Sequence, residues 1–329
     1  MKMWEEAPQT EIFGIPVYTF GLYCLVGALC AVVCIRILCG ELKMKKGTAW
    51  VLSLASIVFG LVFSRLSYCI VRLIGDMIGG GGVLPVSFWF RLSTGGWSLY
   101  GMIFGVFIAA RVTAAITKEP KRRLLDIVSC ALPLAMAAER AGERLFEVFN
   151  ISRSIPDGQF PANTFLAVHD AVYGDNYIAT YDYCAVAAVI LFLLLVFTLT
   201  RGRTREGDVW IMFMILAGAG GAILESLRYD SFMELSFVRI QQAAAAALLV
   251  WGVIAAGKRV SGDRKRLFTA AAISLPITIG AVIGIEFALD KTNLSHVLLY
   301  VLMVIFVAVP VVLGLKLLLG GREKGKEAA

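Results

Sequence analysis

The sequence predicts an all-α, polytopic integral membrane protein with about nine transmembrane helices. Of its 329 residues, 59% are hydrophobic and only 17% are charged, and the mean hydropathy is +0.79. A soluble protein needs far more polar residues to cover its surface. Nine stretches of about 20 mostly apolar residues are long enough to cross a bilayer as helices, which satisfy their own backbone polar groups in hydrocarbon.

The nine predicted spans follow one another along the whole chain. They cover residues 17–39, 49–74, 97–117, 124–148, 178–200, 208–228, 236–257, 266–290 and 297–320. The fourth span is the least apolar, because five charged residues lie between Glu139 and Glu147. A helix that faces lipid does not carry such a run. We therefore expect this helix inside the bundle.

The predicted orientation depends on the basic residues of the loops, because Lys and Arg collect on the cytoplasmic side. Alternate connections hold 18 and 4 of them. The larger set is Lys43, Lys45, Lys46, Lys118, Lys121, Arg122, Arg123, Arg201, Arg203, Arg205, Lys258, Arg259, Arg264, Lys265, Arg266, Arg322, Lys324 and Lys326, and the smaller is Lys2, Arg91, Arg153 and Lys291. The N-terminus is therefore expected outside and the C-terminus in the cytoplasm. The net charge of +7 indicates loops that face anionic lipid, and no nucleic-acid partner is expected.

The N-terminus and the cysteines add no further element to this prediction. Residues 1–16 hold one Lys followed by Glu5, Glu6 and Glu11, and no small-residue cleavage site follows the first apolar run, so the N-terminus does not resemble a cleaved signal peptide. The seven cysteines form no CxxC motif and are expected to be small buried apolar residues, neither disulfides nor metal ligands. No cofactor and no metal are predicted.

Ionisable groups inside the spans are concentrated at one depth, toward the outer ends of the helices. Each costs about 2.5 to 3.5 kcal/mol to insert and is a candidate functional group. They are Arg65, Tyr68 and Arg72 in the second span, Glu139, Arg140, Glu143, Arg144 and Glu147 in the fourth, Glu225, Arg228 and Asp230 at the end of the sixth, and Arg239 in the seventh, where the polar Gln241 and Gln242 follow.

Two interpretations of these groups remain open. They could form interhelical ion pairs that hold the bundle together. They could instead line a polar cavity that binds an anion, because guanidinium groups offer forked donors to a phosphate. Helical spacing would align Arg140 with Arg144, and Glu139 with Glu143, in two stripes of opposite sign.

The connection between the second and third spans is rich in glycine and aromatic residues. It contains Gly79 to Gly82, then Phe88-Trp89-Phe90, then Gly95-Gly96-Trp97. Aromatic residues favour the lipid interface, so this segment is expected along the outer surface. The third span then carries the spacing Gly101-x-x-x-Gly105, which lets helices approach closely.

Six short motifs occur in order on the first six spans. They are G-I-P-V-Y-T-F-G-L (14–22), S-R-L-S-Y (64–68), G-G-W-S-L-Y-G (95–101), E-R-A-G-E-R (139–144), A-T-Y-D (179–182) and E-S-L-R (225–228). In this order they resemble the motifs of the bacterial phosphatidylglycerol–prolipoprotein diacylglyceryl transferases, over about residues 12–256. We accordingly expect a transferase-like domain of seven helices at residues 1–257. Residues 258–329 are expected to add two further helices and a short basic tail.

The resemblance implies a set of site residues. The implied substrate-binding residues are Arg65, Tyr68, Gly142, Arg144, Tyr181, Glu225 and Arg228, and the implied catalytic residues are Tyr100, Arg140 and Glu143. The departures from the family pattern are also specific. The family's His is Tyr100 here, its Asn is Glu143, its first-span Tyr is Phe20 and an Arg of its sixth span is Gly221. Without that His, the candidate bases are Tyr100, Glu143 made more basic by desolvation, and His169 of an outer loop.

The function implied by the resemblance is transfer of a diacylglyceryl group from phosphatidylglycerol to the lipobox cysteine in the signal peptide of a prolipoprotein, in a bacterial plasma membrane. The alternative is a catalytically impaired paralogue that binds lipid or acts as a scaffold in the outer leaflet. A transporter is less favoured, because the charges lie toward one leaflet and the halves show no repeat.

Overall fold

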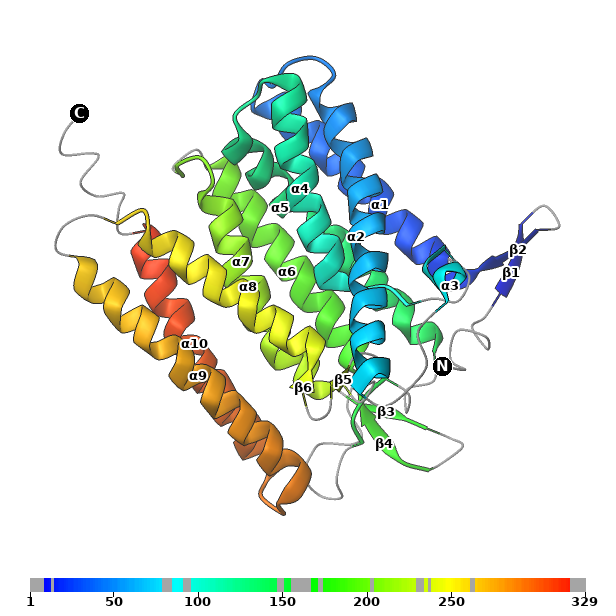
Figure 1. Ribbon diagram of the computed structural model, residues 1–329, viewed down its shortest axis with the longest axis vertical. Helices are drawn as coiled ribbons and strands as arrows, with labels where there is room; N and C mark the ends of the chain where they lie inside the picture. Colours follow the sequence, from blue (N-terminus) through cyan, green and yellow to red (C-terminus); the bar gives the residue numbers. More distant parts are fainter. Residues whose placement is uncertain are drawn as a thin grey trace.

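The computed structural model describes residues 9–12, 15–78, 85–90, 96–146, 151–154, 167–170, 174–201, 204–228, 234–235, 238–260 and 264–319. In this part of the chain, nine helices have 17 residues or more (Figure 1). They are α1 (Thr19–Glu41), α2 (Thr48–Ile78), α4 (Leu99–Thr117), α5 (Lys121–Gly142), α6 (Thr180–Thr200), α7 (Asp208–Leu224), α8 (Ile240–Gly257), α9 (Lys265–Lys291) and α10 (His296–Leu319).

Shorter elements lie between these helices. They are the helix α3 (Val86–Phe90), the 3₁₀ turns η2 (Glu143–Leu145) and η4 (Glu225–Leu227), and three hairpins, β1 (Gln9–Ile12) with β2 (Ile15–Tyr18), β3 (Ala167–His169) with β4 (Asn176–Ile178), and β5 (Glu234–Leu235) with β6 (Val238–Arg239). No hairpin was predicted from the sequence.

The helices confirm the predicted fold class, an all-α polytopic membrane protein. Eight of them are long and apolar enough to cross a membrane. The helix outside this group is α5, which carries the charged residues of the fourth predicted span. Predicted and observed helix ends agree within four residues, with one exception. The fourth span was predicted to reach residue 148, whereas α5 ends at Gly142 and tightens into η2.

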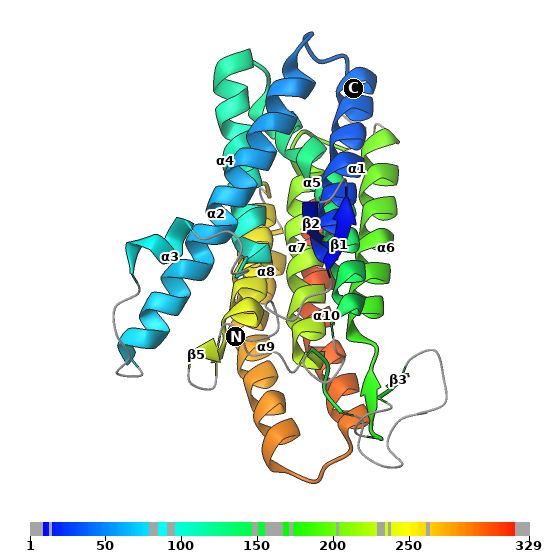
Figure 2. The same ribbon diagram turned by 90° about the vertical axis from the view of Figure 1, so that its right-hand side faces the viewer.

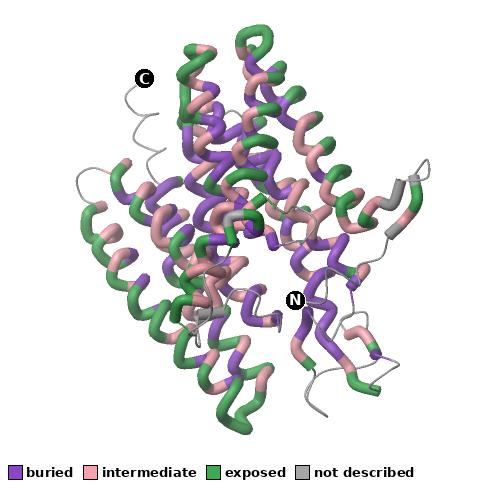
Figure 3. Tube along the Cα trace, turned by 45° about the vertical axis from the view of Figure 1, so that its right-hand side comes forward, coloured by how far each residue is buried: buried purple, intermediate pink, exposed green. Residues whose placement is uncertain are grey.

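The charged helix α5 lies inside the bundle, as expected from its composition. It packs against α1, α4, α6 and α7, and ten consecutive residues, 124–133, are buried. The burial pattern of the described residues shows the contrast with the outer helices, which expose one side along their length (Figure 3). Those exposed sides are apolar, as lipid contact requires.

Glycines allow α4 to approach α2 closely. On α4, Gly101 and Gly105 lie against the backbone of α2, and a β-carbon on Gly101 would stand 2.6 Å from the carbonyl oxygen of Phe63. Any larger residue would therefore force the two helices apart. The interpretation of the Gly101-x-x-x-Gly105 spacing is confirmed. A turned view shows α2 and α4 running side by side (Figure 2).

The connections richest in Lys and Arg meet at one end of the bundle. Arg123 of α5 pairs with Glu206 at 2.9 Å, and Arg259 after α8 pairs with Asp208. Asp126 of α5, only 2% exposed, accepts hydrogen bonds from the backbone N–H groups of Gly207 (2.6 Å) and Trp210 (2.8 Å). It thereby satisfies two donors at the start of α7. These contacts place Lys121 and Lys258 at the same end, as predicted.

One expectation, the burial of all the cysteines, needs correction, and a second, the place of the aromatic segment, is met except at Phe88. All seven cysteines are free thiols, but Cys24 is half-buried and Cys30 is exposed on α1, so only five are buried. In the segment expected along the outer surface, Phe88 is buried against Tyr68, whereas Phe90 is 79% exposed. Several residues named above, Lys2, Gly79–Gly82, Arg91, Gly95, Glu147, Arg203, Asp230, Arg322, Lys324 and Lys326, lie outside the described residues.

Sidedness can be measured directly with reporter fusions. A fluorescent protein fused after residue 119, 206 or 259 should fluoresce, because these connections lie together and carry the cytoplasmic excess of basic residues. A periplasmic phosphatase fused after residue 294, between α9 and α10, should be active. Opposite sides for the fusions at 119 and 259 would contradict both the orientation and the packing.

Candidate functional site

Five charged side chains form a closed ion cluster where α5 and α7 end. They are Glu139, Arg140, Glu143, Glu225 and Arg228. Arg140 is central: its Nε lies 3.3 Å from Glu139, its Nη1 2.8 Å from Glu143 and its Nη2 2.9 Å from Glu225. Arg228 closes the cluster, with Nη1 2.7 Å from the second oxygen of Glu143 and Nε 3.6 Å from Glu225. Three carboxylates and two guanidinium groups give the cluster a formal charge of −1.

Two 3₁₀ turns bring the cluster together. Glu143 and Glu225 each begin such a turn, η2 and η4, at the C-terminal ends of α5 and α7. The spacing i,i+3 then brings Arg140 to Glu143, and Glu225 to Arg228. Arg239 holds η4 from the start of α8. Its Nη1 donates to the carbonyl oxygens of Glu225 (3.1 Å), Ser226 (3.3 Å) and Arg228 (2.7 Å), which satisfies acceptors that the helix end leaves open.

The predicted stripe of Arg140 and Arg144 does not exist. Arg140 is 5% exposed, whereas the side chain of Arg144 is 65% exposed and pairs with Asp182 of α6 at 2.7 Å. The helix ends at Gly142, and the tighter turn that follows carries Arg144 away from the face that holds Arg140. Tyr181 stays with Arg144, whose guanidinium lies 5.7 Å from its ring centre.

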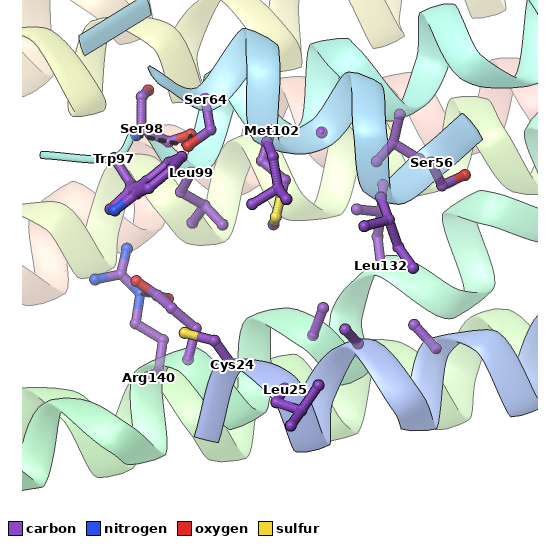
Figure 4. Close-up of a pocket in the computed structure, with 18 of the residues that line it drawn as sticks. Cys24, Leu25, Ser56, Ser64, Trp97, Ser98, Leu99, Met102, Leu132 and Arg140 are labelled. Carbon is purple, nitrogen blue, oxygen red and sulfur yellow. Dashed lines mark hydrogen bonds and ion pairs between the residues drawn. The ribbon is translucent and has the colours of Figure 1, made fainter. Parts of the chain in front are cut away.

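The cluster lies at one end of an amphipathic cavity of about 580 Å³. Charged and polar groups at that end are Glu139, Arg140, Glu143, Arg228, Gln241 and Tyr68. Mostly apolar side chains of α1, α2, α4 and α5 line the remainder, together with Ser53, Ser56 and Ser64 of α2 and Ser98 before α4. In the close-up, Arg140 and Trp97 face one another across one end, and Met102 and Leu132 lie further along (Figure 4).

One side of the cavity reaches the outer surface of the bundle. Leu25 of α1 and Ile57 and Leu61 of α2 all line the cavity, yet they are 55%, 41% and 54% exposed. The exposed surface of these helices is the surface that meets lipid in a membrane. The cavity is therefore accessible sideways, between α1 and α2.

Of the residues implied by the resemblance, four line the cavity: Tyr68, Arg140, Glu143 and Arg228. Glu225 belongs to the ion cluster without being among the lining residues. Gly142 serves packing, because a β-carbon there would stand 2.9 Å from that of Tyr23 on α1.

Arg65 has a different environment from the one expected for a lipid-binding residue. It is buried and donates hydrogen bonds to the carbonyl oxygens of Phe88 (2.6 Å), Trp89 (3.4 Å) and Gly96 (3.0 Å). These bonds hold α3 and the approach to α4 against α2. His169 lies on the hairpin strand β3, exposed, with Nδ1 3.3 Å from the side-chain oxygen of Asn176, and is not among the described residues that line the cavity.

Two departures from the family pattern, Tyr100 and Gly221, lie against each other. A β-carbon on Gly221 of α7 would overlap the hydroxyl oxygen of Tyr100 on α4. The phenol of Tyr100 thus occupies the space into which a side chain at position 221 would extend. Neither motif alone reveals this relation, because the two residues are 121 positions apart.

Among the cavity residues that were not assigned to the site from the sequence are Cys24, Glu139 and Gln241. Glu139 was noted as a charge but was not assigned to the site, although it directly precedes Arg140 in the recognised motif. Gln241 was noted only for its polarity, and its side-chain oxygen is buried without a hydrogen-bond partner among the described residues. Nothing in the sequence distinguished Cys24 from the other apolar residues of its span.

Fold and cavity together define a polytopic helical membrane protein with an amphipathic cavity that ends in a buried ion cluster. The family model for prolipoprotein diacylglyceryl transferase matches residues 9–257. The chain belongs to this family, which confirms the resemblance found in its motifs. The match ends with the last residue of α8, before α9 and α10.

Curated relatives carry the name phosphatidylglycerol–prolipoprotein diacylglyceryl transferase. One from Symbiobacterium thermophilum is 29% identical over 161 residues, which cover 49% of this chain and 59% of that protein. One from Thermotoga petrophila is 25% identical over 204 residues, 60% of this chain and 65% of that protein. One from Oceanobacillus iheyensis is 22% identical over 254 residues, 74% and 84%. The chain thus spans roughly three fifths of the length of the first two.

The contact between Tyr100 and Gly221 can be tested by a double-mutant cycle. Gly221→Ala should lower the free energy of unfolding by about 1–3 kcal/mol, because the new methyl group overlaps the Tyr100 hydroxyl. In a Tyr100→Phe background, which lacks that hydroxyl, the loss should be smaller by at least about 0.5 kcal/mol. Thermal unfolding in detergent measures all four proteins, and additive effects would contradict the contact.

Proposed function

We propose that the protein transfers the diacylglyceryl group of phosphatidylglycerol to the lipobox cysteine of prolipoproteins, in a bacterial plasma membrane. The observation that carries the proposal is the cavity, in which an apolar slot accessible from the side ends at a buried cluster of guanidinium and carboxylate groups. Membership of the family and the names of its relatives agree with it.

The shape of the cavity suits one end of a phospholipid. Acyl chains are apolar and would lie along the slot, which they reach between α1 and α2 past Leu25, Ile57 and Leu61. The head group would then lie at the charged end, beside Arg140 and Arg228. Burial of apolar surface favours the chains in the slot at about 25 cal/mol per Å².

The mixed charge of the cluster suits a phosphate that bears a polyol. Guanidinium groups bind phosphate oxygens through charge-assisted hydrogen bonds. Carboxylates accept hydrogen bonds from hydroxyl groups, and glycerol offers two of these in phosphatidylglycerol. Glu139 and Glu143 lie beside Arg140, so both kinds of contact are available from one place.

In the proposed reaction the cysteine sulfur forms a bond to the terminal carbon of the diacylglyceryl group, and the bond from that carbon to the phosphate oxygen breaks. Glycerol phosphate leaves with the electron pair, and Arg140 stabilises the charge that develops on the leaving oxygen. The thiol must lose its proton to become a nucleophile, and a base in the cavity accepts it.

We assign the base to a carboxylate of the cluster. Tyr100 and His169 are not among the described residues that line the cavity, whereas Glu139 and Glu143 are. Both oxygens of Glu143 accept hydrogen bonds from guanidinium groups. Glu139 pairs with Arg140 through Oε2 at the longer distance of 3.3 Å. Glu139 is therefore the better placed proton acceptor, and Glu143 orients the two arginines.

A second function, a lipid-binding or scaffolding role without transfer, is favoured by the pairing of Arg140. All three of its nitrogens face carboxylates within 3.3 Å, an arrangement also typical of a structural ion network. Purified protein in nanodiscs, given a lipobox peptide and phosphatidylglycerol labelled in its acyl chains, separates the two. Labelled peptide supports the transferase. Saturable lipid binding without labelled peptide supports the scaffold.

Arg140→Lys should weaken binding of phosphatidylglycerol by about 1.5 to 3 kcal/mol, because an ammonium group cannot reproduce the forked contacts of a guanidinium. Lysine keeps the positive charge among three carboxylates, so the protein should remain folded. The matched control is Arg123→Lys, a half-exposed arginine at the start of α5 that pairs with Glu206, away from the cavity. Titration of labelled lipid into nanodiscs measures both, and equal affinities would contradict the role of Arg140.

Glu139→Gln should separate binding from chemistry. The substitution removes one negative charge, which brings the formal charge of the cluster from −1 to 0, so the anionic lipid should bind at least as tightly as before. Loss of the base should lower the transfer rate by about 10²- to 10⁴-fold. Single-turnover transfer with the labelled lipid measures the rate. A full rate in the variant would exclude Glu139 as the base.

A further inference from the structure

Helix α9 carries two carboxylates toward the end of the bundle that holds the ion cluster. Arg153, which follows η2, pairs with both: Nη2 lies 3.0 Å from Glu286 and Nη1 3.0 Å from Asp290. The side chains of Arg153 and Glu286 are only 11% and 16% exposed, whereas that of Asp290 is 57% exposed. The pair with Glu286 is therefore the one shielded from solvent.

Arg153 belongs to a short segment, residues 151–154, that touches both the cavity and the cluster. Ile151 is fully buried and lines the cavity. Ser152 forms a bridge with Arg228, and the backbone N–H of Arg153 donates to the carbonyl oxygen of Leu227 at 3.2 Å. Movement of Arg153 would therefore displace the backbone that carries Arg228.

A second contact of Glu286 connects it to the end of α7, beside Glu225. The other oxygen of Glu286 accepts a hydrogen bond of 2.8 Å from Nε2 of Gln242 on α8, which also donates to the carbonyl oxygen of Ala222 on α7 at 2.9 Å. From α10, the hydroxyl of Tyr300 donates to the carbonyl oxygen of Ser226 at 3.4 Å. These contacts lie on either side of Glu225 in the sequence.

We propose that the hairpin of α9 and α10 is a positioning element for the ion cluster, with Glu286 as the residue through which it acts. An element that served only to thicken the bundle would have no need of a buried carboxylate, whose charge has to be paired and hydrogen-bonded. Here both oxygens of Glu286 hold groups that support Arg228 and Glu225. The hairpin lies beyond the family match, at the flank of α7 and α8 (Figure 1). The part of this inference that concerns catalysis rests on the proposed function.

The test compares Glu286→Gln with Asp290→Asn in the full-length protein. Glutamine keeps the size of the side chain and an acceptor for Gln242, but it loses the charge that holds Arg153. Amide hydrogen exchange at Arg153 and Ile178, whose N–H groups bond across this segment, should become about 10-fold faster in Glu286→Gln. The change should stay below about 2-fold in Asp290→Asn, because exposed pairs contribute little.

In the transfer assay, Glu286→Gln should lower kcat by about 10-fold and leave KM for the lipobox peptide within about 2-fold, because the reacting groups are misplaced while the apolar slot is intact. The exchange of charges, Glu286→Arg with Arg153→Glu, should recover part of the rate lost by either change alone. An unchanged rate of amide hydrogen exchange at Arg153 in Glu286→Gln would overturn the positioning role. Absence of transfer by the unmodified protein would instead overturn the proposed function, because the exchange measurement does not depend on activity.

Discussion

The rest of the site depends on the burial of one guanidinium group, that of Arg140. A charge taken out of water must be paired and hydrogen-bonded, or the protein does not tolerate it. Three carboxylates from α5, η2 and η4 meet this demand. To supply them, α5 and α7 must end side by side and tighten into 3₁₀ turns. The place of α5 inside the bundle follows from the same requirement, since lipid cannot solvate its last turn.

The cavity lies between two pairs of helices, α1 with α5 and α2 with α4. The helix α1 packs mainly on α5, and α2 packs mainly on α4, where Gly101 and Gly105 allow close approach. Between these two pairs, apolar residues line an open slot whose polar end is the ion cluster. Geometry of this kind keeps an amphiphile in one orientation, because its two ends meet opposite environments.

Departures from the family pattern are spatially organised. The Tyr100 hydroxyl lies where a side chain at Gly221 would extend. Glu143 forms ion pairs with both arginines of the cluster. Two sites of departure thus have partners that accommodate them. The additional hairpin joins the same region through Glu286. Contacts from α4, from η2 and from α9 thus converge where α5 and α7 end.

Hydrophobic length and the run of basic residues in alternate loops were sufficient to predict the nine helices and the common end of Lys121 and Lys258, because both properties are local in sequence. The charged fourth span was also placed correctly inside the bundle, from the cost of charges in lipid. The order of six motifs was sufficient for the family.

Contacts across the bundle were decided only by the tertiary structure. The end of α5 at Gly142 separates Arg140 from Arg144, which helical periodicity had aligned. Arg65 binds backbone carbonyl groups of α3 and its neighbours, and Arg153 finds its partner 133 residues away in α9. The sequence by itself determined which charged residues lie at the same depth in the membrane, because the hydropathy pattern sets where each span begins and ends. The pairing of these charges was determined by helix ends and packing. Where an α-helix tightens into a 3₁₀ turn, the side chains point in other directions than helical periodicity predicts.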